Sequence, residues 1–181
     1  LKQKTITSII WKGAERISAQ LVSTIVSIVL ARILMPDDYS VVSIVAIFFA
    51  FCNIFISGGL SSALIQKRDS DELDYSTVLI TNMLLAIVLY VIMFFAAPLI
   101  ADLYKNPILV PVIRVMSLTF FVNGYKSILT AKISAELKFR KFFYSTILGT
   151  IGSAVVGIVM ALNGYGPWAL VAQQMTAAVV G

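Results

Sequence analysis

Charged side chains interrupt an apolar stretch near the start of this 181-residue sequence. Lys12, Glu15 and Arg16 lie within residues 8–27, and the amide Gln20 follows them. A lone charge at the centre of a membrane-crossing helix costs about 2.5–3.5 kcal/mol, even on the most lenient insertion scale. Such side chains are retained where they face water, pair with one another or serve a function.

These polar residues share one side of the helix that the sequence predicts. At about 100° per residue they fall within about 140° of one another: Ser8, Lys12, Glu15, Arg16, Gln20, Ser23 and Ser27. We call this set the N-terminal polar stripe. The opposite side is apolar, with Ile10, Ile17, Leu21, Ile25 and Ile28. Because the stripe continues beyond Gln20, it favours the wall of an aqueous cavity. In the alternative interpretation, Lys12 and Arg16 snorkel to the cytoplasmic interface, and Glu15 is paired locally.

A second polar strip recurs further along the chain. At spacings of four, three and four residues, its members occupy a face about 60° wide: Thr119, Asn123, Lys126 and Thr130. Lys126 lies roughly two turns before a basic connector, so snorkelling is again the alternative. Two helices that each present a cation favour one shared hydrated cleft. Asn53 and Asn82 could line that cleft or form interhelical hydrogen bonds.

The composition is that of a polytopic membrane protein. Residues are 59% hydrophobic and 13% charged, with a mean hydropathy of +0.94, whereas soluble domains are about half apolar and a quarter charged. The apolar residues form runs near the roughly 20 residues that cross a bilayer as a helix. The expected fold is therefore an all-α membrane bundle.

Five complete spans and one incomplete span are expected, at residues 8–34, 39–65, 76–97, 107–135, 142–162 and 167–181. Pro36 and Pro98 should end the first and third spans. Asn106 and Pro107 suit the start of the fourth, as N-cap and first-turn residue. The sixth is short for a crossing and the chain does not begin with Met, so residues 1–181 are interpreted as a fragment, an N-terminal transmembrane lobe.

Small residues recur every four positions in the fifth span, at Ser145, Gly149, Ser153 and Gly157. Such a seam lets two helix backbones approach closely, so we expect a packing face. Bending of this glycine-rich helix during a conformational change is the alternative.

Basic residues are distributed unevenly between the two ends of the spans. Nine of the 14 Lys and Arg residues lie on the side of the chain start and three on the opposite side. This bias predicts a cytoplasmic N-terminus. It also accounts for the net charge of +5, so we do not expect nucleic acid as a partner.

The sequence offers no catalytic apparatus. It has no histidine and a single cysteine, Cys52, and it lacks a phosphate-binding Gly-rich loop or a nucleophile elbow. The acidic loop residues Asp69, Asp71, Glu72 and Asp74 could hold Mg²⁺ in a prenyl-phosphate enzyme, but no second acidic cluster faces them. We therefore expect no enzyme, no catalytic residue, no metal site and no cofactor.

Four segments resemble bacterial polysaccharide exporters of the Wzx-type flippase family, closest to its colanic-acid-exporter-like branch. They are "WKGAERISAQLVSTIVSIVLARILMPDDYSVVSIV", "GLSSALIQKRD", "APLIADLYKNPILVPVIRVMSLTFFVNGYKSI" and "GYGPWALVAQQ". The resemblance extends over nearly the whole chain, in order. "LARILMPDDYS" departs from the usual "LARLLSPEDFG", because Ser40 stands where glycine is usual.

The resemblance implies the MOP (multidrug/oligosaccharidyl-lipid/polysaccharide) superfamily fold, with two six-helix lobes around a cavity that opens alternately to each side. This chain would be the first lobe without the end of its sixth helix. The family moves undecaprenyl-pyrophosphate-linked oligosaccharides from the cytoplasmic to the periplasmic leaflet of the bacterial inner membrane. A polysaccharide polymerase and a chain-length regulator are the implied protein partners.

Roles for individual residues follow from that resemblance. Arg16, and then Lys126, would offset the negative charge of the lipid pyrophosphate, and Glu15 would pair with Arg16 or couple transport to a cation gradient. Sugar hydroxyls would be bound by Gln20, Asn123, Ser23 and Thr119. Near the periplasmic ends, Arg32 and Arg114 would receive the headgroup or act as interfacial anchors.

Three alternatives stay open. A MATE-like drug or cation antiporter of the same fold would need a carboxylate deeper in the membrane than Glu15. A membrane prenyl-phosphate sugar transferase would depend on the acidic loop. A scaffold without transport would present its polar residues as dry helix contacts.

Overall fold

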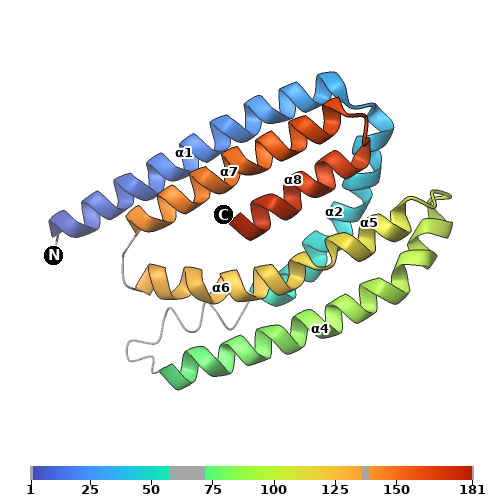
Figure 1. The fold of residues 1–181 in the computed structure, drawn as a ribbon. Coiled ribbons are helices and arrows are strands. Elements are labelled where there is room, and N and C mark those ends of the chain that lie inside the picture. The colour runs from blue at the N-terminus through green and yellow to red at the C-terminus, as the bar shows by residue number, and fades with distance from the viewer. Residues whose placement is uncertain (1, 58–71, 136–138, 181) are drawn as a thin grey trace. The chain divides into compact units, whose positions relative to one another are not determined.

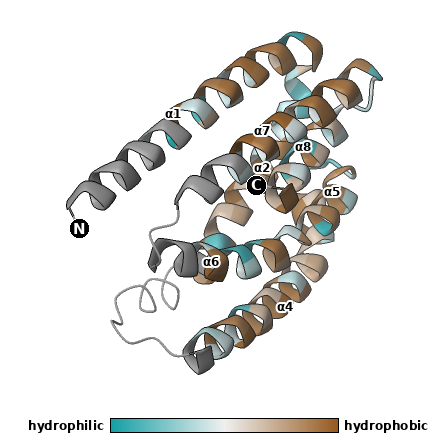
Figure 2. Cartoon of the chain, turned by 60° about the vertical axis from the view of Figure 1, so that its left-hand side comes forward, coloured by the Kyte–Doolittle hydropathy of each residue, from teal (hydrophilic) through white to brown (hydrophobic). Residues whose placement is uncertain are grey.

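The computed structural model describes residues 2–57, 72–135 and 139–180, and the part described is helical without strands. The helices are α1 (Lys2–Ile33), α2 (Pro36–Ser57), α4 (Glu72–Leu103), α5 (Leu109–Met116), α6 (Thr119–Ala135), α7 (Phe139–Leu162) and α8 (Pro167–Val180) (Figure 1). Stretches of α1, α2, α4 and α7 are long and apolar enough to cross a membrane. Figure 2 shows that apolar residues predominate along the helices. The chain is an all-α polytopic membrane protein, as expected.

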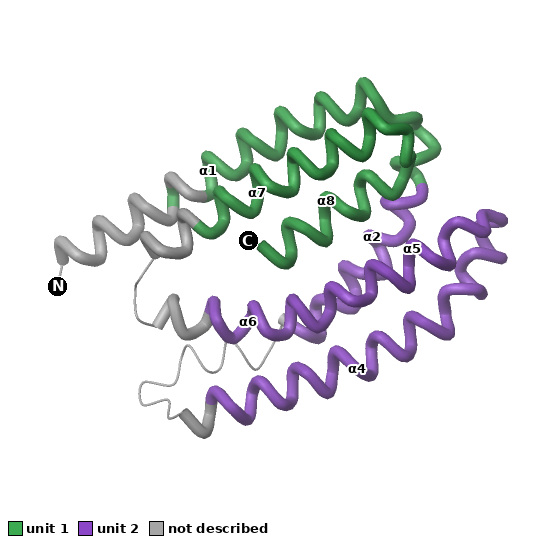
Figure 3. The backbone as a smooth tube through the Cα atoms, viewed as in Figure 1, with its two compact units in different colours: residues 1–40, 136–181 green, residues 41–135 purple. Residues whose placement is uncertain are grey.

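The helices group into two compact units (Figure 3). Unit 1 comprises residues 1–40 and 136–181, and unit 2 comprises residues 41–135.

In unit 1, α7 packs along both α1 and α8 (Figure 1). The small-residue seam is part of this packing, since Ser153 and Gly157 are buried. A Cβ atom on Gly157 would lie only 3.0 Å from Cβ of Gln173 in α8. At the end of α8, the Ser145 hydroxyl donates to the carbonyl oxygen of Val180 at 3.3 Å. The seam therefore brings α7 and α8 together.

The turns of unit 1 are built by proline, glycine and one carboxylate. Pro36 opens α2, and the Asp38 carboxylate accepts a hydrogen bond from the backbone N–H of Met35 at 3.0 Å, which closes the helix start as in a capping box. Gly164 and Gly166, between α7 and α8, have φ values of 77° and 55°. A Cβ on Gly166 would lie 2.9 Å from the Asp38 carboxylate, so this turn packs against the start of α2.

In unit 2, α4 packs along α5 and α6 (Figure 1). The buried apolar side chains recur at helical spacing, as Ala86, Leu89, Met93, Ala97 and Ile100 in α4 and Leu109, Val112, Ile113 and Met116 in α5. The Phe49 ring of α2 stacks on Phe120 of α6, with centroids 4.7 Å apart.

The expected stop at Pro98 is wrong, because α4 runs through Pro98 to Leu103. Proline lacks the N–H that would bond the carbonyl four residues earlier, so the Phe94 carbonyl loses its helical partner. Membrane helices tolerate such a loss because neighbouring groups can satisfy the freed carbonyl.

The expected fourth span, residues 107–135, is two helices with a break at Ser117–Leu118. Across the break, the N–H groups of Leu118, Phe120 and Phe121 each bond the carbonyl three residues earlier, which is the tighter 3₁₀ pattern. The Ser117 hydroxyl donates to the Ile113 carbonyl at 2.7 Å. Hydroxyls that bond back to the helix in this way bend it.

The start of that segment also differs from the expectation. α5 begins at Leu109, with Pro107 in the preceding turn. Asn106 still acts locally, because its side-chain oxygen accepts a hydrogen bond from the backbone N–H of Ile108 at 3.3 Å. The predicted end of the second span, beyond Ser57, lies outside the described residues.

Candidate functional site

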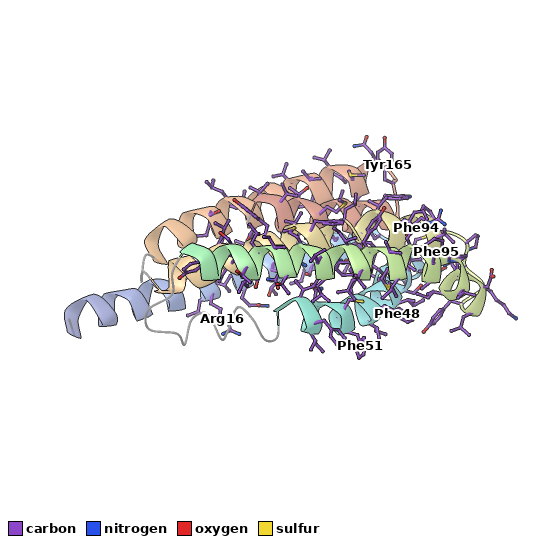
Figure 4. The ribbon with its side chains drawn as sticks, turned by 90° about the horizontal axis from the view of Figure 1, so that it is seen from below. Arg16, Phe48, Phe51, Phe94, Phe95 and Tyr165 are labelled. Atoms are coloured by element: carbon purple, nitrogen blue, oxygen red, sulfur yellow. The ribbon has the colours of Figure 1, made fainter. Side chains whose placement is uncertain are left out.

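In unit 1, α1 has an exposed polar face and an exposed apolar face. Its polar face carries the deeper part of the N-terminal polar stripe, and Arg16, Gln20, Ser23 and Ser27 are all exposed. Figure 4 shows the Arg16 side chain projecting from the helix. The side chains of Ser8, Lys12 and Glu15 lie outside the described part of the chain. The stripe is thus an open polar surface from Arg16 onward.

A second face of α1 is apolar and also exposed. Ile17, Leu21 and Ile25 have 65%, 60% and 61% of their surface accessible. In a membrane, these side chains suit contact with lipid or with another apolar helix. The polar stripe lies on a different side, so it need not face the same surroundings.

Buried residues of α1 lie beside its exposed polar residues. α1 packs along α7, and Val26 and Leu30 are buried, at 5% and 1% accessibility. On a wheel of about 100° per residue these two residues fall within the arc of the N-terminal polar stripe, at its edge next to Ser23. The sequence alone therefore did not show that this edge of the polar arc carries buried apolar residues deeper along the helix.

Unit 2 contains a layer of amide side chains. The Asn123 amide of α6 donates to the side-chain oxygen of Asn53 in α2 at 3.0 Å, so these two residues form the interhelical hydrogen bond that was one of the expected alternatives. Asn82 of α4 is 1% exposed, and its side-chain nitrogen has no hydrogen-bond partner among the described residues. A Cβ on Gly124 would lie 3.5 Å from the backbone oxygen of Asn82, so α6 approaches α4 closely here.

Lys126 lies one turn along α6 from Asn123 and is partly buried. Within the described residues, no carboxylate forms an ion pair with it. Thr130, the last member of the second polar strip, is also partly buried. The strip therefore lies at the margin of unit 2 rather than on its fully exposed surface.

Thr119 lies at the break between α5 and α6. The residue is buried at 7% accessibility, and its hydroxyl donates to the Met116 carbonyl at 2.7 Å. That carbonyl belongs to the end of α5, where helical partners run out. The hydroxyl therefore helps to close the break, and its binding of a sugar stays a prediction.

The two outer arginines have different surroundings. Arg32 is exposed in the last turn of α1. Arg114 is partly buried in unit 2, with its guanidinium carbon 4.1 Å from the centroid of the Phe94 ring. Sequence reasoning missed this aromatic partner, although the i, i+4 spacing of Tyr90 and Phe94 signals a pair on one helix face.

The structure does not bring every candidate together. Arg16 belongs to unit 1 and Lys126 to unit 2, so their meeting in one cleft remains a prediction. The acidic loop residues Asp69 and Asp71 lie outside the described residues, and so do the side chains of Glu72 and Asp74. Among the residues described, no group of acidic or cysteine side chains could hold a metal ion.

Comparison with known proteins adds an independent finding. Residues 29–181 match the family described as "Polysaccharide biosynthesis protein". The chain is 28% identical over 141 residues to the lipopolysaccharide biosynthesis protein WzxC of Escherichia coli K12, covering 78% of this chain and 29% of WzxC. It is 26% identical over 152 residues to the succinoglycan biosynthesis transport protein ExoT of Rhizobium meliloti 1021, covering 84% of this chain and 31% of ExoT.

A membrane protein of the cps region of Klebsiella pneumoniae is 24% identical over 163 residues, covering 88% of this chain and 34% of that protein. The chain thus spans about a third of the length of the curated relatives that it matches. No solved structure matches the chain.

Proposed function

This chain belongs to the polysaccharide biosynthesis protein family of Wzx-type flippases, and from that premise we propose that it forms part of a transporter for lipid-linked oligosaccharides. The substrate class is an undecaprenyl-pyrophosphate-linked repeat unit, and the movement is from the cytoplasmic to the periplasmic leaflet of the bacterial inner membrane by alternating access. The protein carries its substrate across without covalent chemistry.

The observation that carries this proposal is the exposed polar face of α1. Arg16, Gln20 and Ser23 are accessible on a helix that is long and apolar enough to cross a membrane and that also has an exposed apolar face. A polar stripe on a spanning helix is stable where it borders water or a polar ligand, because hydrocarbon would leave its groups unsatisfied. A hydrated transport path supplies that environment.

Arg16 is the main ligand of the lipid pyrophosphate headgroup in this proposal, for electrostatic reasons. A lipid pyrophosphate carries negative charge through a region of low dielectric, where attraction to a cation is far stronger than in water. The planar guanidinium can bind phosphate oxygens with two parallel N–H donors, whereas an ammonium acts as a point charge. Arg16 is thus the main headgroup ligand in this proposal, and Glu15 is its partner when the path is empty, or the group that couples transport to a cation gradient.

Lys126 is the second cation of the proposed path. It is partly buried without an ionic partner among the described residues. The positive charge of Lys126 would therefore attract an incoming anion without competition from a paired carboxylate. Gln20 and Ser23 are exposed donors and acceptors for sugar hydroxyls. Asn123 can contribute its remaining hydrogen-bonding capacity while its amide donates to Asn53.

The proposed orientation places the N-terminus in the cytoplasm, as the distribution of basic residues predicts. The released lipid-linked units would then reach the side where a polysaccharide polymerase and a chain-length regulator assemble the polymer. These two proteins are the expected partners of the full-length transporter.

The experiment that tests the proposal replaces Arg16 in the full-length protein. We expect Arg16→Gln to abolish surface polysaccharide while the membrane protein level stays within about twofold of wild type, since the Arg16 side chain is exposed. Arg16→Lys should retain a small fraction of export because the charge remains. The measurements are immunoblots of surface polymer and of the tagged protein in a strain that lacks the native gene.

Lys105→Gln is a matched control, because it removes one exposed positive charge from the turn after α4. Its surface polymer should equal that of wild type. Normal polymer from Arg16→Gln would remove Arg16 from the mechanism. Replacing Asp69, Asp71, Glu72 and Asp74 together with Asn separates the transferase alternative, which predicts complete loss of polymer, from the transporter, which predicts near-normal export.

A further inference from the structure

Two interruptions of helical hydrogen bonding occur in neighbouring helices of unit 2. In α4, Pro98 has no N–H group, so the Phe94 carbonyl lacks its helical partner. In the adjacent segment, α5 and α6 are separated by the break at Ser117–Leu118. α4 packs along both of these helices (Figure 1). A bend in α4 can therefore be accompanied by a bend between α5 and α6.

Aromatic contacts place the two interruptions at nearly the same level. Before the break, the guanidinium carbon of Arg114 lies 4.1 Å from the centroid of the Phe94 ring. After the break, the ring of Phe121 lies 5.7 Å from that of Tyr90, centroid to centroid. Phe94 and Tyr90 are one turn apart on α4, about 6 Å at 1.5 Å per residue. The break at Ser117–Leu118 thus lies within about one turn of the missing bond in α4.

The segment between the two interruptions is a closed helical hairpin, which we call the 98–117 hairpin. Its turn is fixed by backbone bonds, because the N–H of Lys105 donates to the Asp102 carbonyl at 3.2 Å and that of Asn106 to the Ala101 carbonyl at 3.0 Å. With Lys105 at a φ of 51°, this is the Schellman pattern that ends a helix. Its buried apolar side chains are Ile100, Ala101, Leu109, Val112, Ile113 and Met116. The hairpin can therefore move as one body.

On the other side of the interruptions, α6 is tied to α2 and α4. The Phe120 ring stacks on Phe49 of α2 with centroids 4.7 Å apart, and the Asn123 amide donates to the Asn53 side chain at 3.0 Å. α6 also packs along α4. These contacts hold α6, the adjoining part of α2 and the first part of α4 together as a second body.

At the break, one carbonyl has a hydrogen-bond partner that it can exchange. In a continuous α-helix the Phe120 N–H would bond the Met116 carbonyl four residues earlier. Here that N–H bonds the Ser117 carbonyl at 3.1 Å, and the Thr119 hydroxyl donates to the Met116 carbonyl at 2.7 Å. A short 3₁₀ stretch inside a helix often marks a hinge. Bending there exchanges one donor for another, so the Met116 carbonyl stays paired, as hydrocarbon surroundings require.

We propose that Pro98 and the break at Ser117–Leu118 form a paired hinge, about which the 98–117 hairpin changes its angle to α6 and to the first part of α4. Bending at proline breaks no hydrogen bond, because the bond is already absent. The inference rests on the proposed function, in which this bending opens and closes the periplasmic end of the transport path. In the proposed orientation, the turn after α4 lies at that end.

The test measures one distance across the hinge in the full-length protein. Native cysteines, including Cys52, are replaced, and spin labels are attached through Ile47→Cys in α2 and Leu103→Cys in the 98–117 hairpin. Both side chains are exposed, at 67% and 75%, so the labels leave the core intact. Double electron–electron resonance in nanodiscs measures the distance with and without undecaprenyl pyrophosphate.

The variants act on each interruption separately. Pro98→Ala supplies the missing N–H, and because the proline ring is exposed, the change removes no core packing. Pro111→Ala is its matched control, since Pro111 is exposed in the first turn of α5, where N–H groups have no helical partner. Thr119→Val removes the hydroxyl and keeps the branched shape, whereas Thr119→Ser keeps the hydroxyl.

We expect two distances in the otherwise wild-type protein, with proportions that undecaprenyl pyrophosphate changes. Pro98→Ala and Thr119→Val should each leave one distance, because a continuous helix resists bending, and Thr119→Ser should retain both. Export by Pro98→Ala should fall about tenfold or more, since a conformational step can limit transport. Its thermal midpoint and its binding of undecaprenyl pyrophosphate should not fall, whereas a merely structural role would lower them. Pro111→Ala should match wild type in every measurement.

A single distance in the wild-type protein under both conditions would overturn the hinge. Two unchanged distances in both Pro98→Ala and Thr119→Val, or normal export by Pro98→Ala, would overturn it as well. These results would leave the proposed function intact, because Arg16→Gln tests that function separately. An absence of saturable binding of undecaprenyl pyrophosphate to the wild-type protein would contradict the proposed function, and the distances would still show whether the hinge bends.

Discussion

Three asparagines of unit 2 differ in whether their side chains are hydrogen-bonded within the described residues. The Asn123 amide of α6 donates to the side-chain oxygen of Asn53 in α2 at 3.0 Å. Asn82 is buried with an amide nitrogen that has no partner among the described residues. Interhelical hydrogen bonds in membrane proteins contribute about 0.6 kcal/mol on average, whereas an unsatisfied buried polar group costs about 1–3 kcal/mol.

Replacement by leucine, a side chain with the same branching at Cγ, should therefore act in opposite directions at the two sites. We expect Asn123→Leu to lower the thermal midpoint of the purified protein, because the Asn53 oxygen loses its donor. Asn82→Leu should leave the midpoint unchanged or raise it, because an unpaired amide is removed. Thermal unfolding in one detergent measures both, and an equal loss at both positions would contradict this account of Asn82.

Two glycines of α7 differ in how closely a neighbouring helix approaches them. Gly157 brings α7 to within contact distance of Gln173 in α8, and a Cβ there would meet the Gln173 Cβ at 3.0 Å. Gly152 lies on the same helix, and a Cβ there would meet nothing within 4 Å. The two glycines differ in packing while sharing one helix, so they form a matched pair.

We predict that Gly157→Ala lowers the thermal midpoint, since a Cβ fixed to the backbone cannot rotate away from α8. Gly152→Ala should raise it slightly, because alanine favours a helix over glycine by up to about 1 kcal/mol. Differential scanning fluorimetry of the two variants checks the sign of each effect. A higher midpoint for Gly157→Ala than for wild type would show that α7 and α8 are not held by this close approach.

The helical elements also show what a sequence can and cannot predict. The turn signals at Pro36 and at residues 163–167 are local, and the structure confirms both. Pro98 misled the prediction because its effect depends on neighbouring helices that can compensate a lost hydrogen bond. The break at Ser117–Leu118 carries neither glycine nor proline, and the Ser117 and Thr119 hydroxyls there bond back to helix carbonyls.

The sequence predicted part of the candidate site, as it predicted part of the helical structure. Helical periodicity alone placed Arg16, Gln20 and Ser23 on one face of α1, and the structure leaves that face exposed. The Thr119 hydroxyl bonds a carbonyl only three residues earlier, but the burial of Thr119 and the contact of Arg114 with Phe94 depend on tertiary packing that no spacing encodes. The meeting of Arg16 with Lys126 concerns two separate units and remains a prediction.

For the molecule as a whole, the proposed transport path depends on one physical difference between two exposed faces of α1. The polar face should border water inside a transport path, and the apolar face should border hydrocarbon or another helix. Both faces are accessible in this chain, so exposure by itself does not distinguish them. Reactivity toward a charged reagent does, because such a reagent reaches only hydrated positions.

The most direct measurement places single cysteines at Gln20, Ser23, Leu21 and Ile25 in full-length protein whose native cysteines, including Cys52, are replaced. In membranes, a charged methanethiosulfonate reagent should modify the cysteines at positions 20 and 23 at least about tenfold faster than those at 21 and 25, since thiolates form readily only in water. Added undecaprenyl pyrophosphate should slow the reaction at 20 and 23. Equal and slow modification at all four positions would contradict a hydrated, cation-lined path along α1.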